Sequence, residues 1–150
     1  MCLIVDANVA SRVFAVPPVA DFEPIWRWIE DRDGRLVYGG RNRAELERVG
    51  EARRRLFTLW QAGRAIRITA ERVSVEERII AKLGRCRSDD PHVIALARAS
   101  GARVLCTEDV DLERDFKDRQ LVPRPRGAIF KRKSHWRLLK HNPICEGRPR

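Results

Sequence analysis

Four acidic residues of this sequence stand where ordinary surface charges are not expected: Asp6, Glu45, Asp90 and Asp109. Two like charges about 4 Å apart repel by roughly 4 kcal/mol at an effective dielectric near 20. A pocket of several carboxylates is therefore tolerable only when some are protonated or when a divalent cation neutralises them. Oxygen ligands without sulfur or imidazole favour Mg²⁺ or Mn²⁺ over zinc. If these acids converge, metal-assisted chemistry is expected.

Glu45 differs from its acidic neighbours on a helical wheel. Residues 43–60 are predicted to form one long helix, whose apolar face consists of Val49, Ala52, Leu56 and Trp60. At about 100° per residue, Glu45 falls within this face, whereas Glu47 and Glu51 fall on the charged side. Because a buried unpaired carboxylate is costly, Glu45 is expected to pair with a basic residue or to face a cleft that holds a cation.

The same construction singles out Asp90 at the start of a helix predicted at 89–100. Asp90 lies on the side of the apolar residues Val93, Ile94 and Ala97. His92 falls on the opposite side and is therefore a poor candidate for a general base. A charge at the helix N-terminus is the alternative interpretation of Asp90, with Ser88 or Asp89 as the cap. Asp89 is also the alternative to Asp90 as the site residue.

The predicted elements bring the acids to one edge of a sheet. Strands are predicted at 3–5, 35–38, 65–69, 103–106 and 128–130, and helices at 22–30, 43–60, 71–83, 89–100 and 108–116. Strands alternating with helices predict an α/β fold of three layers, α/β/α, with a central, mainly parallel sheet of four to five strands. Ligand sites of such folds lie at the carboxyl ends of the strands. Asp6 and Asp109 follow apolar strands and are expected there.

Positive charge is concentrated near the end of the chain. The net charge is +10, and residues 123–150 hold nine Lys or Arg against one acid. We predict one domain at 1–122 and a basic C-terminal extension at 123–150 that packs on it. A basic excess attracts nucleic acid, and the predicted nucleic-acid-binding residues are Arg124, Arg126, Lys131, Arg132, Lys133, Arg137 and Lys140. A solubilising surface and binding of an acidic protein partner are the alternatives.

The N-terminal residues and the apolar segments indicate a soluble, cytoplasmic protein. Residues 1–6 have no positively charged leader and too short an apolar run for a signal peptide. No apolar stretch approaches the roughly 20 residues that a membrane helix needs. Phe14, Trp26 and Trp28 are expected either in the core or on a partner surface, and Trp136 either stacks on an unpaired base or packs on the domain.

Several segments of the chain together resemble the PIN-domain family of small nucleases. The first strand ends in Asp6-Ala7-Asn8, which is similar to the opening motif of that family. Arg43-Ala44-Glu45-Leu46 is similar to its second acidic element. The stretch from Asp90 to Ala97 and the string Thr107-Glu108-Asp109-Val110-Asp111-Leu112 resemble its third and fourth. The resemblance runs from the first strand to about Phe116.

This resemblance implies a metal-dependent endoribonuclease that hydrolyses phosphodiester bonds of RNA. It implies Mg²⁺ or Mn²⁺ held by Asp6, Glu45, Asp90 and Asp109, with Asp111, Asn8 and Thr107 as accessory residues. Many bacterial members are toxins paired with an antitoxin protein, and members often form homodimers. A catalytically silent nucleic-acid-binding or protein-binding module on the same fold is the main alternative, and a DNA nuclease on a related fold is another.

Overall fold

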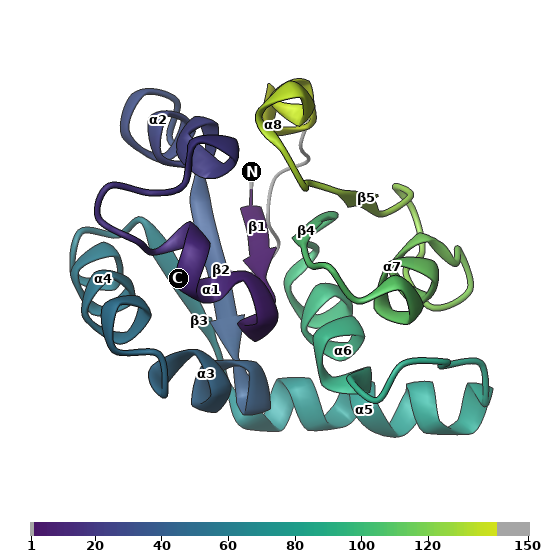
Figure 1. Cartoon of the computed structure of the whole chain (residues 1–150). Helices are drawn as coiled ribbons and strands as arrows, with labels where there is room; N and C mark the ends of the chain where they lie inside the picture. Colours follow the sequence, from purple (N-terminus) through teal and green to yellow (C-terminus); the bar gives the residue numbers. More distant parts are fainter. Residues whose placement is uncertain (1, 141–150) are drawn as a thin grey trace.

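The structure, a computed structural model, describes residues 2–140 and is built on five short strands (Figure 1). The strands are β1 (Cys2–Val5), β2 (Arg35–Gly39), β3 (Ala65–Ile68), β4 (Val104–Cys106) and β5 (Ala128–Ile129). Their order is β3-β2-β1-β4-β5, and every neighbouring pair is parallel. From β1 the chain first adds strands β2 and β3 on one side and then β4 and β5 on the other. Folds of this kind bind ligands at such a switch point, which here is the β1–β4 junction.

Helices cover both faces of this sheet. They are α1 (Ala7–Val13), α2 (Glu23–Asp31), α3 (Gly40–Glu47), α4 (Gly50–Gln61), α5 (Ala70–Leu83), α6 (Pro91–Ser100), α7 (Val110–Lys117) and α8 (Arg137–Lys140), with 3-10 turns η1 (Ala20–Phe22) and η2 (Lys133–His135). Side chains of alternate β1 residues point to the two faces of the sheet. Ile4 packs with residues of α5, α6 and α7, and Leu3 packs with residues of α1, α2 and α4. The predicted three-layer α/β/α fold with a parallel sheet is confirmed.

The prediction of one long helix at 43–60 is wrong in one respect, because this segment forms two helices. Helix α3 ends at Glu47 and α4 begins at Gly50, with Val49 in extended conformation between them. Both helices contact α1, but α3 also contacts α5 and α6, whereas α4 packs on β3. The interruption lets α3 lie at the carboxyl edge of the sheet while α4 covers its face. Helix α1 was not predicted at all.

The C-terminal segment belongs to the same core as far as residue 140. Strand β5 pairs with β4, and the side chains of Phe130 and Leu139 are buried. The boundary between residues 122 and 123 stays a prediction, and residues 141–150 of the predicted extension lie outside the described residues. The aromatic residues considered for a partner surface are core residues, namely Phe14, Trp26 and Trp28. Within residues 2–140, no helix has both the length and the apolar character required to cross a membrane.

Candidate metal centre

Asp6 lies at the carboxyl end of the central strand, at the β1–β4 junction. Its backbone N–H donates to the carbonyl oxygen of Cys106 (2.9 Å), which extends the pairing of the strands by one residue. The residue is only 4% exposed. Thr107 donates its hydroxyl hydrogen to Oδ2 of Asp6 (2.8 Å), and the same hydroxyl oxygen accepts from Nδ2 of Asn8 (3.4 Å). The predicted accessory residues Thr107 and Asn8 therefore hold this carboxylate in place.

Helix α3 is fixed to the end of β1 by a buried amide. Gly40 opens the helix at a φ of +56°, a conformation that favours glycine. Asn42 is fully buried, and its Nδ2 donates to the carbonyl oxygen of Val5 (3.1 Å). Its Oδ1 has no hydrogen-bond partner among the described residues. Glu45 follows Asn42 by about one helical turn, so it projects toward the same edge as Asp6.

Asp90 is placed by the loop that precedes α6. It occupies the N-cap position of that helix but makes no side-chain capping hydrogen bond. The buried carboxylate of Asp115 accepts hydrogen bonds from the backbone N–H groups of Arg87 (3.0 Å) and Ser88 (2.9 Å), which fixes the loop just before Asp90. The Asp90 side chain is 28% exposed, and Asp89 is exposed to solvent. Asp90, and not Asp89, therefore lies near Glu45 and His92.

Glu45, Asp90 and His92 form one cluster. One candidate ligand atom from each lies within 4.8 Å of the others. Nε2 of His92 is 3.4 Å from Oε1 of Glu45, and its Nδ1 is 4.0 Å from Oδ1 of Asp90. The His92 side chain is only 3% exposed, and neither ring nitrogen has a hydrogen-bond partner among the described residues. A buried imidazole between two carboxylates, with its nitrogens unused, is able to bind a metal ion.

The electrostatics of Asp6 connect it to this cluster. Burial raises the pKa of Asp6, and the negative charges of Asp90 and Glu45 raise that pKa further. The hydrogen bonds from the Thr107 hydroxyl and the Ala7 backbone lower that pKa, each by less than burial raises it. The carboxylates of Asp6, Glu45 and Asp90 thus repel one another, and a divalent cation bound between them would offset this repulsion.

The cluster does not include Asp6, and the fourth predicted ligand, Asp109, also lies outside it. Its Oδ1 accepts from the backbone N–H groups of Asp111 (2.9 Å) and Leu112 (3.2 Å), so it caps α7. Thr107 links it to Asp6, because the Thr107 hydroxyl accepts from the Asp109 N–H (3.1 Å) and donates to Asp6. Asp111 is exposed. A ligand role of Asp109 and an accessory role of Asp111 stay predictions.

The placement of His92 opposite the site was wrong, for two reasons. Asp90 is not helical (φ −120°, ψ 54°), so its direction cannot be compared with that of His92 on a helical wheel. Moreover, α6 is buried on nearly all sides and has no solvent face that a wheel would identify. Asn42 was missed as well. The available signal was a polar residue one helical turn before Glu45, on a helix that follows a strand.

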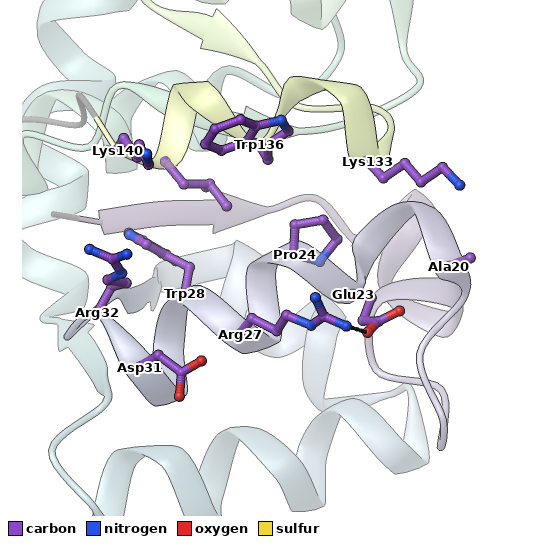
Figure 2. Close-up of a pocket in the computed structure, with 11 residues that line it drawn as sticks. Ala20, Glu23, Pro24, Arg27, Trp28, Asp31, Arg32, Lys133, Trp136 and Lys140 are labelled. Carbon is purple, nitrogen blue, oxygen red and sulfur yellow. Dashed lines mark hydrogen bonds and ion pairs between the residues drawn. The ribbon is translucent and has the colours of Figure 1, made fainter.

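The pocket drawn in Figure 2 lies at the opposite edge of the sheet. It encloses about 480 Å³ between α2 and the η2–α8 segment, near the start of β1 in Figure 1. Trp28 and Trp136 line it, together with charged residues from both segments. Trp136 is 41% exposed, and Nζ of Lys140 lies 4.7 Å from the centre of its ring. None of the clustered acids lines this pocket.

None of the predicted nucleic-acid-binding residues belongs to the cluster of Glu45, Asp90 and His92. Their segment follows the end of α7, contributes β5 and ends in α8, whereas α3 lies at the other end of the sheet (Figure 1). Lys131 pairs with Glu113, and Arg124 and Arg126 line a small hollow with Arg119. Arg132 and Lys133 flank the start of η2, and Arg137 and Lys140 begin and end α8. A nucleic-acid role of this segment stays a prediction.

Comparisons of the chain with protein families, with curated protein sequences and with solved structures found no match. The functional interpretation therefore depends on the chemistry of the residues themselves, above all on the group of Glu45, Asp90 and His92, which could hold a metal ion.

Proposed function

We propose that this chain is a PIN-type, divalent-metal-dependent endoribonuclease. The observation that supports this most directly is the buried His92, which has no hydrogen-bond partner among the described residues and lies between Glu45 and Asp90. Asp6, whose pKa these two acids raise, completes the ligand set from the end of β1. Three carboxylates and an imidazole at the switch point of a parallel sheet fit a hydrolytic metal site better than a structural ion pair.

The imidazole changes the preferred metal. Oxygen ligands alone suit Mg²⁺, whereas imidazole suits transition metals. With His92 among the ligands, the proposed ion is Mn²⁺ in preference to Mg²⁺. Asp109, held near Asp6 through Thr107, remains a candidate for a further ligand on the open side.

The residues of the chain have separate roles in the proposed reaction. A bound ion would lower the pKa of a water ligand and stabilise negative charge on the scissile phosphate. Thr107 keeps the Asp6 carboxylate oriented through its hydroxyl. Asn42 keeps α3, and therefore Glu45, at a constant position relative to β1. Arg41, whose Nε lies 3.3 Å from Oε1 of Glu45, is exposed and close enough to contact the phosphate beside the site.

Digestion of single-stranded RNA tests this proposal. The purified protein is expected to cleave RNA with Mn²⁺, more slowly with Mg²⁺, and not at all with excess chelator. The Asp6→Asn and Asp90→Asn variants are expected to lose cleavage while they keep the fold, which circular dichroism checks. Cleavage that survives chelator or both substitutions would contradict the proposal. RNA binding without cleavage under any metal would identify the silent module instead, and matched DNA would reveal a DNA nuclease.

A toxin role is a further part of the proposal, supported by the resemblance to the PIN-domain family. Expression of the wild-type protein is expected to arrest growth, and Asp6→Asn is expected to relieve the arrest. Co-expression of an acidic antitoxin protein would also relieve it. Equal growth arrest by the wild type and Asp6→Asn would show that toxicity does not depend on the metal centre.

A further inference from the structure

A groove lined with arginines begins beside the metal centre and continues along the edge strand β3. Two adjoining hollows of about 430 and 560 Å³ share Arg43 and Arg67 as lining residues. Together they are lined by five arginines and two glutamates: Arg41, Arg43, Arg53, Arg54, Arg67, Glu47 and Glu77. The first hollow starts at Gly40 and Arg41 on α3, the helix that carries Glu45. Arg41, which lines this hollow, also contacts Glu45, so the groove begins beside the proposed active site.

The charges of this groove are only partly neutralised. Arg41, Arg43 and Arg54 form ion pairs with Glu45, Glu47 and Glu51. Arg53 and Arg67 form no ion pair with any residue of the described part of the chain. Two arginines without carboxylate partners, next to three ion pairs that are at least partly exposed, attract a polyanion.

Aromatic rings complete this surface. The guanidinium of Arg67 lies 3.8 Å from the centre of the Trp60 ring, and its Nε donates to the hydroxyl of Tyr38 (2.6 Å). Trp60 is 40% exposed, Phe57 is 49% exposed, and their ring centres are 6.1 Å apart. Exposed rings beside fixed guanidinium groups are the combination that binds single-stranded nucleic acid, because bases stack on the rings while arginines contact phosphates.

We propose that this groove, defined by its five arginines with Phe57 and Trp60, binds the single-stranded RNA substrate on one side of the scissile phosphate. This proposal rests on the proposed nuclease function in one respect. Only if Glu45 belongs to the active site does RNA bound in the groove run toward the scissile phosphate. An acidic peptide would also match the charge, but its carboxylates would not stack on the paired aromatic rings as nucleic-acid bases do. The groove rather than the C-terminal segment is then the main RNA-binding surface.

The test measures RNA binding without cleavage. Fluorescence anisotropy with a labelled single-stranded RNA of about twelve nucleotides, in chelator, gives the affinity of the full chain at several salt concentrations. Arg53→Gln with Arg67→Gln is expected to weaken binding at least about tenfold and to reduce the slope of log K against log salt by about 1.4, the value for two lost phosphate contacts on a single strand. Arg53→Gln with Arg54→Gln, both on the exposed side of α4, repeats the test without disturbing Tyr38.

Two further variants of equal charge serve as the comparison. Arg32→Gln with Arg119→Gln removes the same charge from exposed positions outside the groove and is expected to change affinity less than threefold. Arg126→Gln with Arg137→Gln tests the C-terminal segment. The proposal is overturned if the groove variants bind RNA like the wild type, if all pairs weaken binding equally, or if an acidic peptide binds the groove and RNA does not. Because no cleavage is measured, these outcomes stay separate from failure of the nuclease proposal.

Discussion

The two edges of the parallel sheet show opposite kinds of polar group. At the carboxyl edge, Asp6, Asn42 and His92 are buried, and several of their polar atoms have no partner within residues 2–140. At the amino edge, the pocket of Figure 2 is lined by exposed charges such as Arg27, which pairs with Glu23. The proposed metal site therefore rests on buried polar groups without hydrogen-bond partners, and not on the pocket of Figure 2.

The largest expected difference between the edges is in cleavage. Asp90→Asn should lower the cleavage rate with Mn²⁺ by more than about a hundredfold, beyond the range typical of residues that only support a metal ligand. Asp31→Asn, which changes an exposed acid of the amino-edge pocket, should leave the rate within about twofold of wild type. Single-turnover digestion of one RNA by both variants makes the comparison. Equal cleavage rates for the Asp90→Asn and Asp31→Asn variants would contradict the assignment of cleavage to the carboxyl edge.

A smaller effect is expected in metal binding. His92→Gln should weaken Mn²⁺ binding by about ten- to a hundredfold, because the ion loses an imidazole ligand, and should weaken Mg²⁺ binding less. Isothermal titration calorimetry with each ion measures both affinities. His135→Gln is the matched control, because Nδ1 of His135 only accepts from the backbone N–H of Lys131. An unchanged Mn²⁺ affinity in His92→Gln would remove His92 from the ligand set.

Two tryptophans of nearly equal exposure, Trp60 (40%) and Trp136 (41%), allow a sharper comparison. Base stacking contributes about 1–3 kcal/mol, so Trp60→Ala should weaken RNA binding about fivefold or more. Trp136→Ala, at the amino edge, should change it less than about twofold if that pocket takes no part in binding. Anisotropy in chelator measures both. A larger loss for Trp136→Ala would assign RNA to the amino edge instead.

The smallest effect expected is on stability. Because burial and two neighbouring acids raise the pKa of Asp6, its ionised form destabilises the metal-free fold at neutral pH. Asp6→Asn should therefore raise Tm by a few degrees in chelator at pH 7. The gain should disappear near pH 3.8, the ordinary pKa of an aspartate, because Asp6 is protonated in the folded protein there. Asp21→Asn is the exposed control. A lower Tm for Asp6→Asn at pH 7 would contradict the assigned repulsion.

The sheet was predictable because each strand is a short apolar run. All five strands lie within a residue or so of their predicted positions, and the carboxyl-edge rule placed Asp6 correctly. The helical wheel that distinguishes Glu45 assumes one helix where the structure has two. It therefore relies on residues of α4, which do not share the axis of α3. His92 could not be found this way, because its position beside Glu45 comes from the contact between α6 and α3, which no local pattern records.

The hydrogen bond from Thr107 to Asp6 joins residues 101 positions apart in the chain. During synthesis, Asp6 leaves the ribosome long before β4 and Thr107 are available to complete its surroundings. The proposed metal centre is therefore complete only after β4 and Thr107 have been made. If the chain is the nuclease proposed above, the nascent polypeptide would gain its activity toward RNA only at that point.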